Sequence, residues 1–224
     1  MRMLSAVVLL WCASSLSAGE KYYVVIFGSQ SAVPVPNQTH TWATYVRVIE
    51  VPNAPPAVSV DTISWMPASL KIRPVAFKPE QGVNLNVDQS IRYALSEKQH
   101  ISAWGPFEIT AEYYKRGLGQ KIAIDNGRYL YKSVDPDVGP KSKYIANCVH
   151  AVTDIDPLRV RLQYSELRRH GQFMSHFIVH RIHEDGFVVD PDTTHDDIRK
   201  LLGIDDEPVA WRRYSGTRFL IPWK

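Results

Sequence analysis

Residues 39–51 read THTWATYVRVIEV, a run of β-branched and aromatic residues that predicts one long strand. Successive side chains of a strand point to opposite faces of the sheet. One face of this strand therefore carries His40, Trp42, Thr44, Val46 and Val48, and the other carries Thr41, Ala43, Tyr45, Arg47 and Ile49. The pattern places a histidine near the start of the strand, on the same face as a tryptophan.

Further strands are predicted on both sides of this run. Residues 21–27 are rich in tyrosine and valine and form a first strand. After residue 51, the two prolines of residues 53–56 predict a turn, because proline cannot donate to a strand ladder. Residues 58–65 then form the antiparallel partner of the long strand, and residues 70–77 a further strand.

Helices are predicted from residue 87 onward. Asn86 caps a helix over residues 87–98, and Thr110 caps one over residues 111–118 that ends near Gly119. Between them, residues 104–106 (Trp-Gly-Pro) predict a break. Residues 128–134 alternate as a strand, residues 173–182 fit either a helix or a buried strand, and Thr194 caps a last helix that ends at Gly203.

The first 18 residues have the features of a secretory signal. Arg2 provides the positive start, residues 4–10 the apolar stretch, and residues 15–18 a small-residue cleavage region. The apolar stretch is shorter than the roughly 20 residues that span a bilayer. Trp11 is too bulky to precede a lipid-modified Cys12. We therefore expect an exported protein without a stable membrane anchor, in which residues 1–18 are the signal peptide and residues 19–224 one domain with a C-terminal extension.

Charge and length narrow the class of protein. Removal of Arg2 lowers the formal net charge from +3 to +2, and the lysines and arginines are dispersed, so no nucleic-acid partner is expected. The 206 residues from 19 to 224 are enough for one substantial core. The predicted fold is α+β, with an antiparallel sheet of about five or six strands packed on helices.

Cys148 is the one cysteine left after residue 18, in the string NCVHAV of residues 147–152. Exported proteins usually pair their cysteines in disulfides, so an unpaired thiol needs another explanation. It is a catalytic nucleophile, half of an intermolecular disulfide, or an inert buried residue.

The position of Cys148 favours a nucleophile. A short helix is predicted to start at this residue, and the backbone N–H groups of a helix start lower a thiol pKa and can hold an oxyanion. His150 is two residues away and points elsewhere on a helix, so the base must come from another element. In papain-like enzymes a histidine on a strand beside the cysteine helix is that base, which makes His40 the candidate.

Two motifs carry a family resemblance. The histidine strand of residues 39–46 resembles that of the lecithin retinol acyltransferase-like proteins, His-Trp-Ala-Ile-Tyr-Val-Gly, and residues 147–152 are similar to their Asn-Cys-Glu-His-Phe motif. Both motifs belong to the circularly permuted branch of the NlpC-type papain-like superfamily, in which the histidine strand precedes the cysteine helix, as here. The whole chain resembles a group of exported bacterial proteins with the same blocks.

The resemblance implies a permuted papain-like arrangement and residue roles. Cys148 would be the nucleophile and His40 the base, with Asn147, His150 and Trp42 as supporting motif residues. Ser64 or Asp61 on the next strand could orient the base. The chain departs from the family pattern at Thr41, which separates His40 from Trp42, and at Arg47, where the family has glycine.

The expected function is thiol-based acyl chemistry on an amide or ester. The substrate could be a cell-wall peptide or a lipid, the acceptor water, an alcohol or an amine, and no cofactor is needed. A catalytically inactive binding or structural domain is the alternative. A metal-dependent protein is a further reading, with the weak zinc candidates His176, His180 and His183, and His176 is also a reserve base for Cys148.

Overall fold

The computed structural model describes residues 19–33, 35–134, 144–155, 171–214 and 216. The signal peptide predicted for residues 1–18 lies outside these residues. None of the helices in the described ranges is long and apolar enough to cross a bilayer.

The main sheet has five strands in the order β3-β2-β1-β6-β9. The first four are antiparallel, and β9 lies parallel to β6. The predicted all-antiparallel sheet is therefore a mixed one. Its strands are β1 (Glu20–Gln30), β2 (Thr39–Ile49), β3 (Ala57–Ile63), β6 (His100–Glu108) and β9 (Val209–Arg212).

A second, smaller sheet has the strand order β4-β5-β7-β8 and follows directly from β3. Its strands are β4 (Trp65–Pro67), β5 (Glu80–Asn84), β7 (Leu130–Tyr131) and β8 (Ile145–Ala146). The helices are α1 (Val87–Ser96), α2 (Ala111–Asp125), α3 (Cys148–Thr153), α4 (Gln172–Glu184) and α5 (Asp196–Leu202), with a 3₁₀ turn at Pro36–Gln38. The described fold is thus α+β.

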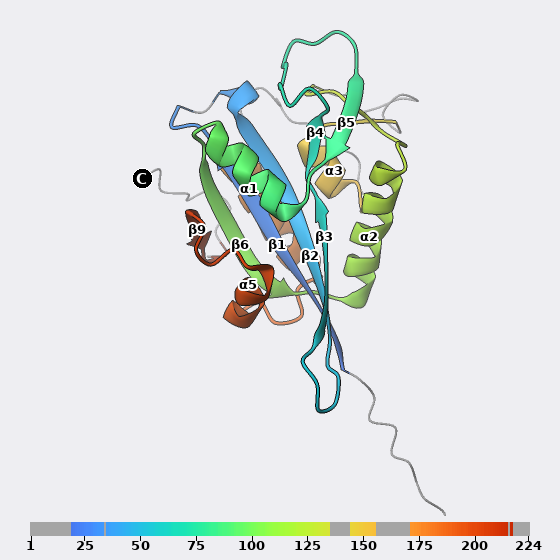
Figure 1. Cartoon of the computed structure of the whole chain (residues 1–224), viewed down its shortest axis with the longest axis vertical. Coiled ribbons are helices and arrows are strands. Elements are labelled where there is room, and N and C mark those ends of the chain that lie inside the picture. Colours follow the sequence, from blue (N-terminus) through green and yellow to red (C-terminus); the bar gives the residue numbers. More distant parts are fainter. Residues whose placement is uncertain (1–18, 34, 135–143, 156–170, 215, 217–224) are drawn as a thin grey trace, which may run out of the picture.

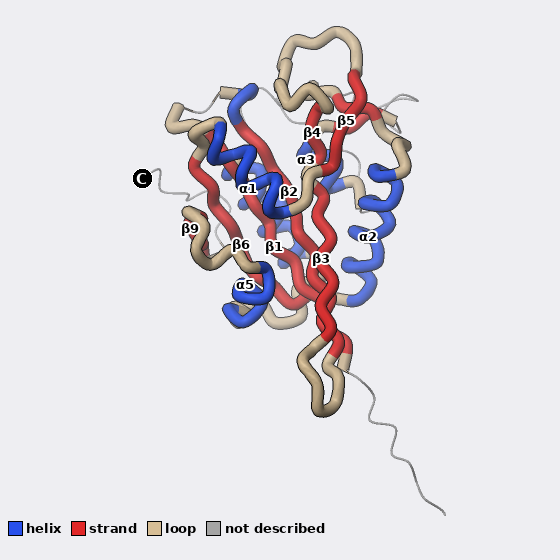
Figure 2. Tube along the Cα trace, in the orientation of Figure 1, coloured by secondary structure: helices blue, strands red, loops and turns tan. Residues whose placement is uncertain are grey.

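Both faces of the main sheet are covered, because β1 and β2 are buried on both sides. On one face, Phe27 and Trp42 stack at 5.1 Å between ring centroids and pack against Ile91 of α1. On the other face, Ala43 and Tyr45 belong to a core cluster with residues of α2, α3 and α4. Figure 1 shows α1 and α5 in front of the sheet, and Figure 2 shows further helices behind it. The alternation predicted for residues 40–48 is confirmed.

Three predicted elements differ from the structure. Residues 70–77 form a loop instead of a strand. Leu70 adopts a left-handed backbone conformation with φ 54°, and the next strand, β5, begins only at Glu80. Residues 104–106 do not end a strand, because β6 passes through them with an irregular register opposite Val24 and Ile26. Helix α2 continues past Gly119, where open space surrounds the glycine.

Two smaller predictions also change, and one open alternative is settled. The strand expected at residues 128–134 is reduced to β7. Residues 173–182, which fit either a helix or a buried strand, lie in helix α4. The N-cap of α5 is His195 instead of Thr194, whereas Gly203 ends this helix in the left-handed conformation, as expected.

Candidate functional site

Cys148 is the first residue of α3, as the sequence predicts. Asn147 caps the helix: its Oδ1 accepts from the His150 backbone N–H at 2.8 Å, and its Nδ2 donates to the Ser133 carbonyl at 3.2 Å. Both the cap and the cysteine are buried. The Asn147 side chain therefore ties the start of α3 to the preceding loop and fixes the backbone that carries the thiol.

The surroundings of Cys148 are apolar. The residue is 3% exposed and forms a cluster with Val149 and Met174, against which Phe173 and Phe177 of α4 pack. Helix α3 itself contacts β2, the strand that carries His40. Because α3 has only six residues, its dipole is short, and a nucleophilic role for the thiol would require a neighbouring base.

The structure brings His40 and Ser64 together. The His40 Nε2 atom lies 2.8 Å from Ser64 Oγ, and neither side chain is exposed. Ser64 Oγ lies 2.7 Å from Ser90 Oγ on α1, and Ser90 Oγ lies 2.7 Å from the Asn86 carbonyl oxygen. These four groups are called the His40 relay; the side chains of His40, Ser64 and Ser90 are buried, and the Asn86 end is exposed.

The donors in the His40 relay are known for two of its three contacts. Ser90 Oγ is the donor toward Ser64 Oγ and toward the Asn86 carbonyl. At the third contact, the donor depends on which nitrogen of His40 carries the proton, because a hydroxyl can both donate and accept.

His40 and Trp42 lie on the same face despite the extra threonine between them. Their rings are stacked, with centroids 5.3 Å apart and planes 20° from parallel. Thr41 occupies the opposite face, where its Oγ1 donates to the Gly171 carbonyl at 3.3 Å. The side chain of Thr41 thus joins β2 to the start of α4.

Asp61, the other candidate for orienting the base, lies elsewhere. Its carboxylate accepts from the Tyr114 hydroxyl at 3.4 Å and is 3.6 Å from Lys121 Nζ. These partners belong to α2, on the other side of the sheet from α1. Of the two candidates, Ser64 is the one in contact with His40.

Helix α1 carries both Ser90 of the His40 relay and Tyr93. Burial first, and then the charges of Glu97 and Cys148, raises the pKa of Tyr93 to about 12. Tyr93 is three residues after Ser90, so the two residues are neighbours on the helix surface. Ser90 of the relay and Tyr93, whose pKa is affected by the charge of Cys148, thus lie one turn apart on α1.

Sequence reasoning did not identify Ser90 or Tyr93. Ser90 lies four residues after its cap Asn86 in a run whose pattern indicates only an amphipathic helix. The sequence did contain a signal for Ser90. This serine lies on the buried stripe of the helix, between Val87 and Ile91, and a buried hydroxyl requires a hydrogen-bond partner.

The three histidines of α4 have individual partners. His176 lies 6.0 Å from the Trp104 ring, and its pKa is lowered by burial and by His180. His180 contacts the Tyr214 hydroxyl through Nδ1 at 2.7 Å and Glu184 through Nε2 at 3.2 Å. His183 Nδ1 donates to the Val179 carbonyl at 2.7 Å. Within the described ranges, no three histidine, cysteine or acidic side chains form a metal-binding group.

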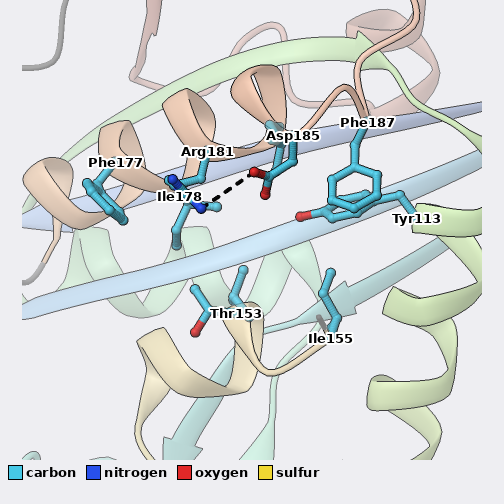
Figure 3. A pocket seen from close by; sticks show the side chains of 10 residues that line it. Tyr113, Thr153, Ile155, Phe177, Ile178, Arg181, Asp185 and Phe187 are labelled. Carbon is cyan, nitrogen blue, oxygen red and sulfur yellow. Dashed lines mark ion pairs between the residues drawn. The ribbon is translucent and has the colours of Figure 1, made fainter. Parts of the chain in front are cut away.

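A pocket lies between α4, the end of α3 and the start of α2 (Figure 3). The rings of Tyr113 and Phe187 close one end, and Arg181 and Asp185 form an ion pair of 3.5 Å on the α4 side. Phe177, at the other end, also packs against the Cys148 cluster. Most of the lining is apolar, and the remaining lining residues are Val152, Thr153, Ile155, Ile178 and Ile182.

Comparisons with known proteins do not extend these observations. No family model, no curated protein and no solved structure matches the chain.

Proposed function

We propose that the protein is a cysteine-dependent enzyme that transfers an acyl group from an amide or ester to water or to another acceptor. Cys148 is the nucleophile, His40 the base and Ser64 the group that orients the base. The proposal includes the circularly permuted papain-like arrangement, with the histidine strand before the cysteine helix.

The observation that carries the proposal is the His40 relay. The Ser64 hydroxyl in contact with Nε2 holds the buried imidazole in one orientation, as a general base requires. In the proposed tautomer, Nε2–H donates to Ser64 and Nδ1 is the basic nitrogen. Cys148 lies at the start of a helix that contacts the same strand.

The reaction follows from these roles. His40 Nδ1 accepts the thiol proton, and the Cys148 thiolate attacks the carbonyl carbon. The His150 N–H is bound by the Asn147 cap, so the backbone N–H that stabilises the oxyanion in this proposal is that of Cys148 or Val149 at the start of α3. The leaving amine or alcohol takes the proton from His40, which leaves a thioester. Water or a second acceptor, deprotonated by His40, then releases the acyl group and the thiol.

A second candidate is a catalytically inactive binding or structural domain. The 3% exposure of Cys148 and its apolar neighbours favour this reading, because apolar surroundings raise a thiol pKa and burial blocks access. The two candidates differ in one measurable property, the ionisation of the Cys148 thiol.

The test is the rate of Cys148 alkylation by iodoacetamide as a function of pH. The chain from residue 19 onward has one cysteine, so labelling reports this thiol alone. The alkylation midpoint is the pH at which the rate reaches half its maximum. We expect it to lie below the free-thiol pKa of about 8.5. His40→Ala should raise the midpoint, and His176→Ala, which removes the reserve base, should leave it unchanged.

Two additions make the result decisive. His40→Gln retains a donor toward Ser64 and tests whether the effect reflects the lost base or a disturbed core. Circular dichroism of each variant confirms that it is folded. A thiol that does not react in the folded protein, or a midpoint indifferent to both His40 variants, supports the inactive domain.

A further inference from the structure

The loop between β4 and β5, residues 68–79, projects from one end of the molecule (Figure 2). It carries the two most exposed large apolar side chains of the described residues, Phe77 at 97% and Val75 at 83% exposure. Leu70 is 40% exposed in the same loop. Exposed apolar side chains gathered in one projecting segment indicate an interaction surface.

The base of this loop is held in place. Ile72 is buried in a cluster with Met66 and Leu85, and the Leu70 carbonyl accepts from the Tyr93 hydroxyl at 3.1 Å. The Leu70 N–H donates to the Pro67 carbonyl at 2.8 Å. The loop therefore has a defined shape, and the exposure of Phe77 and Val75 is a property of that shape.

The charges of the loop have one sign. Lys71, Arg73 and Lys78 alternate with the apolar residues, and residues 68–79 contain no aspartate or glutamate. Lys71, Arg73 and Lys78 are all exposed. The surface thus combines apolar tips with cations at their sides.

We propose that the β4–β5 loop binds the surface of an anionic phospholipid bilayer. Phe77 and Val75 enter the boundary between headgroups and acyl chains, while Lys71, Arg73 and Lys78 remain at the phosphate level. Near a membrane surface each cation adds attraction to anionic lipids. Binding is reversible, and it goes beyond the proposed function because it does not require Cys148 to react.

The same end of the molecule carries a second exposed apolar site. The loop between β1 and β2 lies there too, and it carries Val33, which is 73% exposed (Figure 1). Because α3, which begins with Cys148, packs on β4, the strand that leads into the loop, bilayer binding would hold the Cys148 site close to the membrane surface.

The test measures binding of the chain from residue 19 onward to phosphatidylcholine vesicles with and without phosphatidylglycerol. We expect binding to the vesicles that contain phosphatidylglycerol, and weakening by salt because the attraction is partly electrostatic. The double variant Val75→Ser, Phe77→Ser should lose at least about tenfold in affinity. Arg73→Gln, Lys78→Gln should lose a similar factor and become less sensitive to salt.

Matched variants outside the loop serve as controls. Val51→Ser, Val189→Ser removes two exposed valines, and Lys115→Gln, Lys200→Gln removes two exposed cations, and both should bind normally. Cys148→Ala should also bind normally, which separates this proposal from the enzymatic one. Absence of binding by the unaltered chain, equal binding to neutral vesicles, or equal losses in the control variants would overturn the proposal.

Discussion

Among individual residues, the orientation of Thr41 fixes which face of β2 carries His40 and Trp42. It faces α4 and donates to the Gly171 carbonyl, so His40 and Trp42 both face α1. The inserted threonine therefore does not move His40 away from Trp42. It gives the opposite face of β2 a polar side chain that binds the start of α4. The Thr41 Oγ1 atom also lies 3.3 Å from Ser175 Oγ.

Ser64 has a positioning role that can be tested. Ser64→Ala removes the hydroxyl partner of His40 Nε2 and the acceptor of the Ser90 hydroxyl, and should lower the free energy of unfolding by about 1–3 kcal/mol. Since His40 would lose its fixed orientation, the alkylation midpoint of Cys148 should also rise, by less than in His40→Ala. Urea unfolding and the alkylation pH profile measure the two effects.

Thr62→Val is the matched control for Ser64. Thr62 is also buried, two residues earlier, and its hydroxyl pairs with Thr44 at 3.1 Å. The control should cost stability through the lost hydroxyl pair and leave the alkylation profile unchanged. If Ser64→Ala behaves in the same way, Ser64 is a structural residue only.

Among elements, α4 packs on β1 at unusually short range because Gly28 has no side chain. A Cβ at this position would lie 2.6 Å from Ser175 Oγ and 2.8 Å from the backbone of residues 171 and 172. Ser175 Oγ in turn donates to the Phe27 carbonyl at 2.6 Å. Close backbone approach and this hydrogen bond hold the helix against the sheet.

The glycine contact gives opposite expectations for two substitutions. Gly28→Ala should destabilise the protein by about 1–3 kcal/mol, because backbone atoms of α4 must shift to admit a methyl group. Gly119→Ala should stabilise it by about 1 kcal/mol, because this glycine lies inside α2 with open space around it. Thermal unfolding of both variants measures the difference, and a stabilising Gly28→Ala would contradict the described packing of α4.

For the whole molecule, the C-terminal part belongs to the main fold. Helix α4 covers one face of the sheet, and β9 extends its edge beside β6. Tyr214, just after β9, stacks on His183 with ring centroids 3.9 Å apart and bonds to His180. The end of the described chain is thus tied to α4 through two histidines.

This arrangement makes stability depend on pH. Burial lowers the pKa of His176 and His183 below the ordinary value of 6.5, and the proximity of His180 lowers both further, while the His183 bond to Val179 acts in the opposite direction. The unfolded chain therefore binds more protons than the folded one just below pH 6.5. Stability is fully present above that pH and is lost as the pH falls through the folded pKa values.

His183→Phe should flatten this dependence while retaining the ring contacts with Tyr214 and Phe107. The melting temperature of the variant should decline less between pH 7 and pH 5 than that of the unaltered protein. His100→Gln, at an exposed position, is the control. An identical decline in both variants and the unaltered protein would show that His183 does not contribute.

The local sequence was sufficient for elements that depend on local interactions. The strand at residues 39–49 follows from its alternation, and the starts of α1, α2 and α3 follow from Asn86, Thr110 and Asn147, each of which bonds to the backbone three residues later. These are short-range patterns, so a sequence displays them directly.

Tertiary structure decided the rest, because the relevant partners are far apart in the chain. Residues 70–77 alternate like a strand, yet no neighbouring strand pairs with them and the segment remains a loop. Residues 209–212 form a strand through β6, a partner about 110 residues earlier. The path of the chain from β3 into β4 makes Ser64, instead of Asp61, the partner of His40. Ser90 joins the relay only because α1 packs on that face. The sequence alone thus determined the candidate chemistry at His40 and Cys148, and packing determined which side chains surround it.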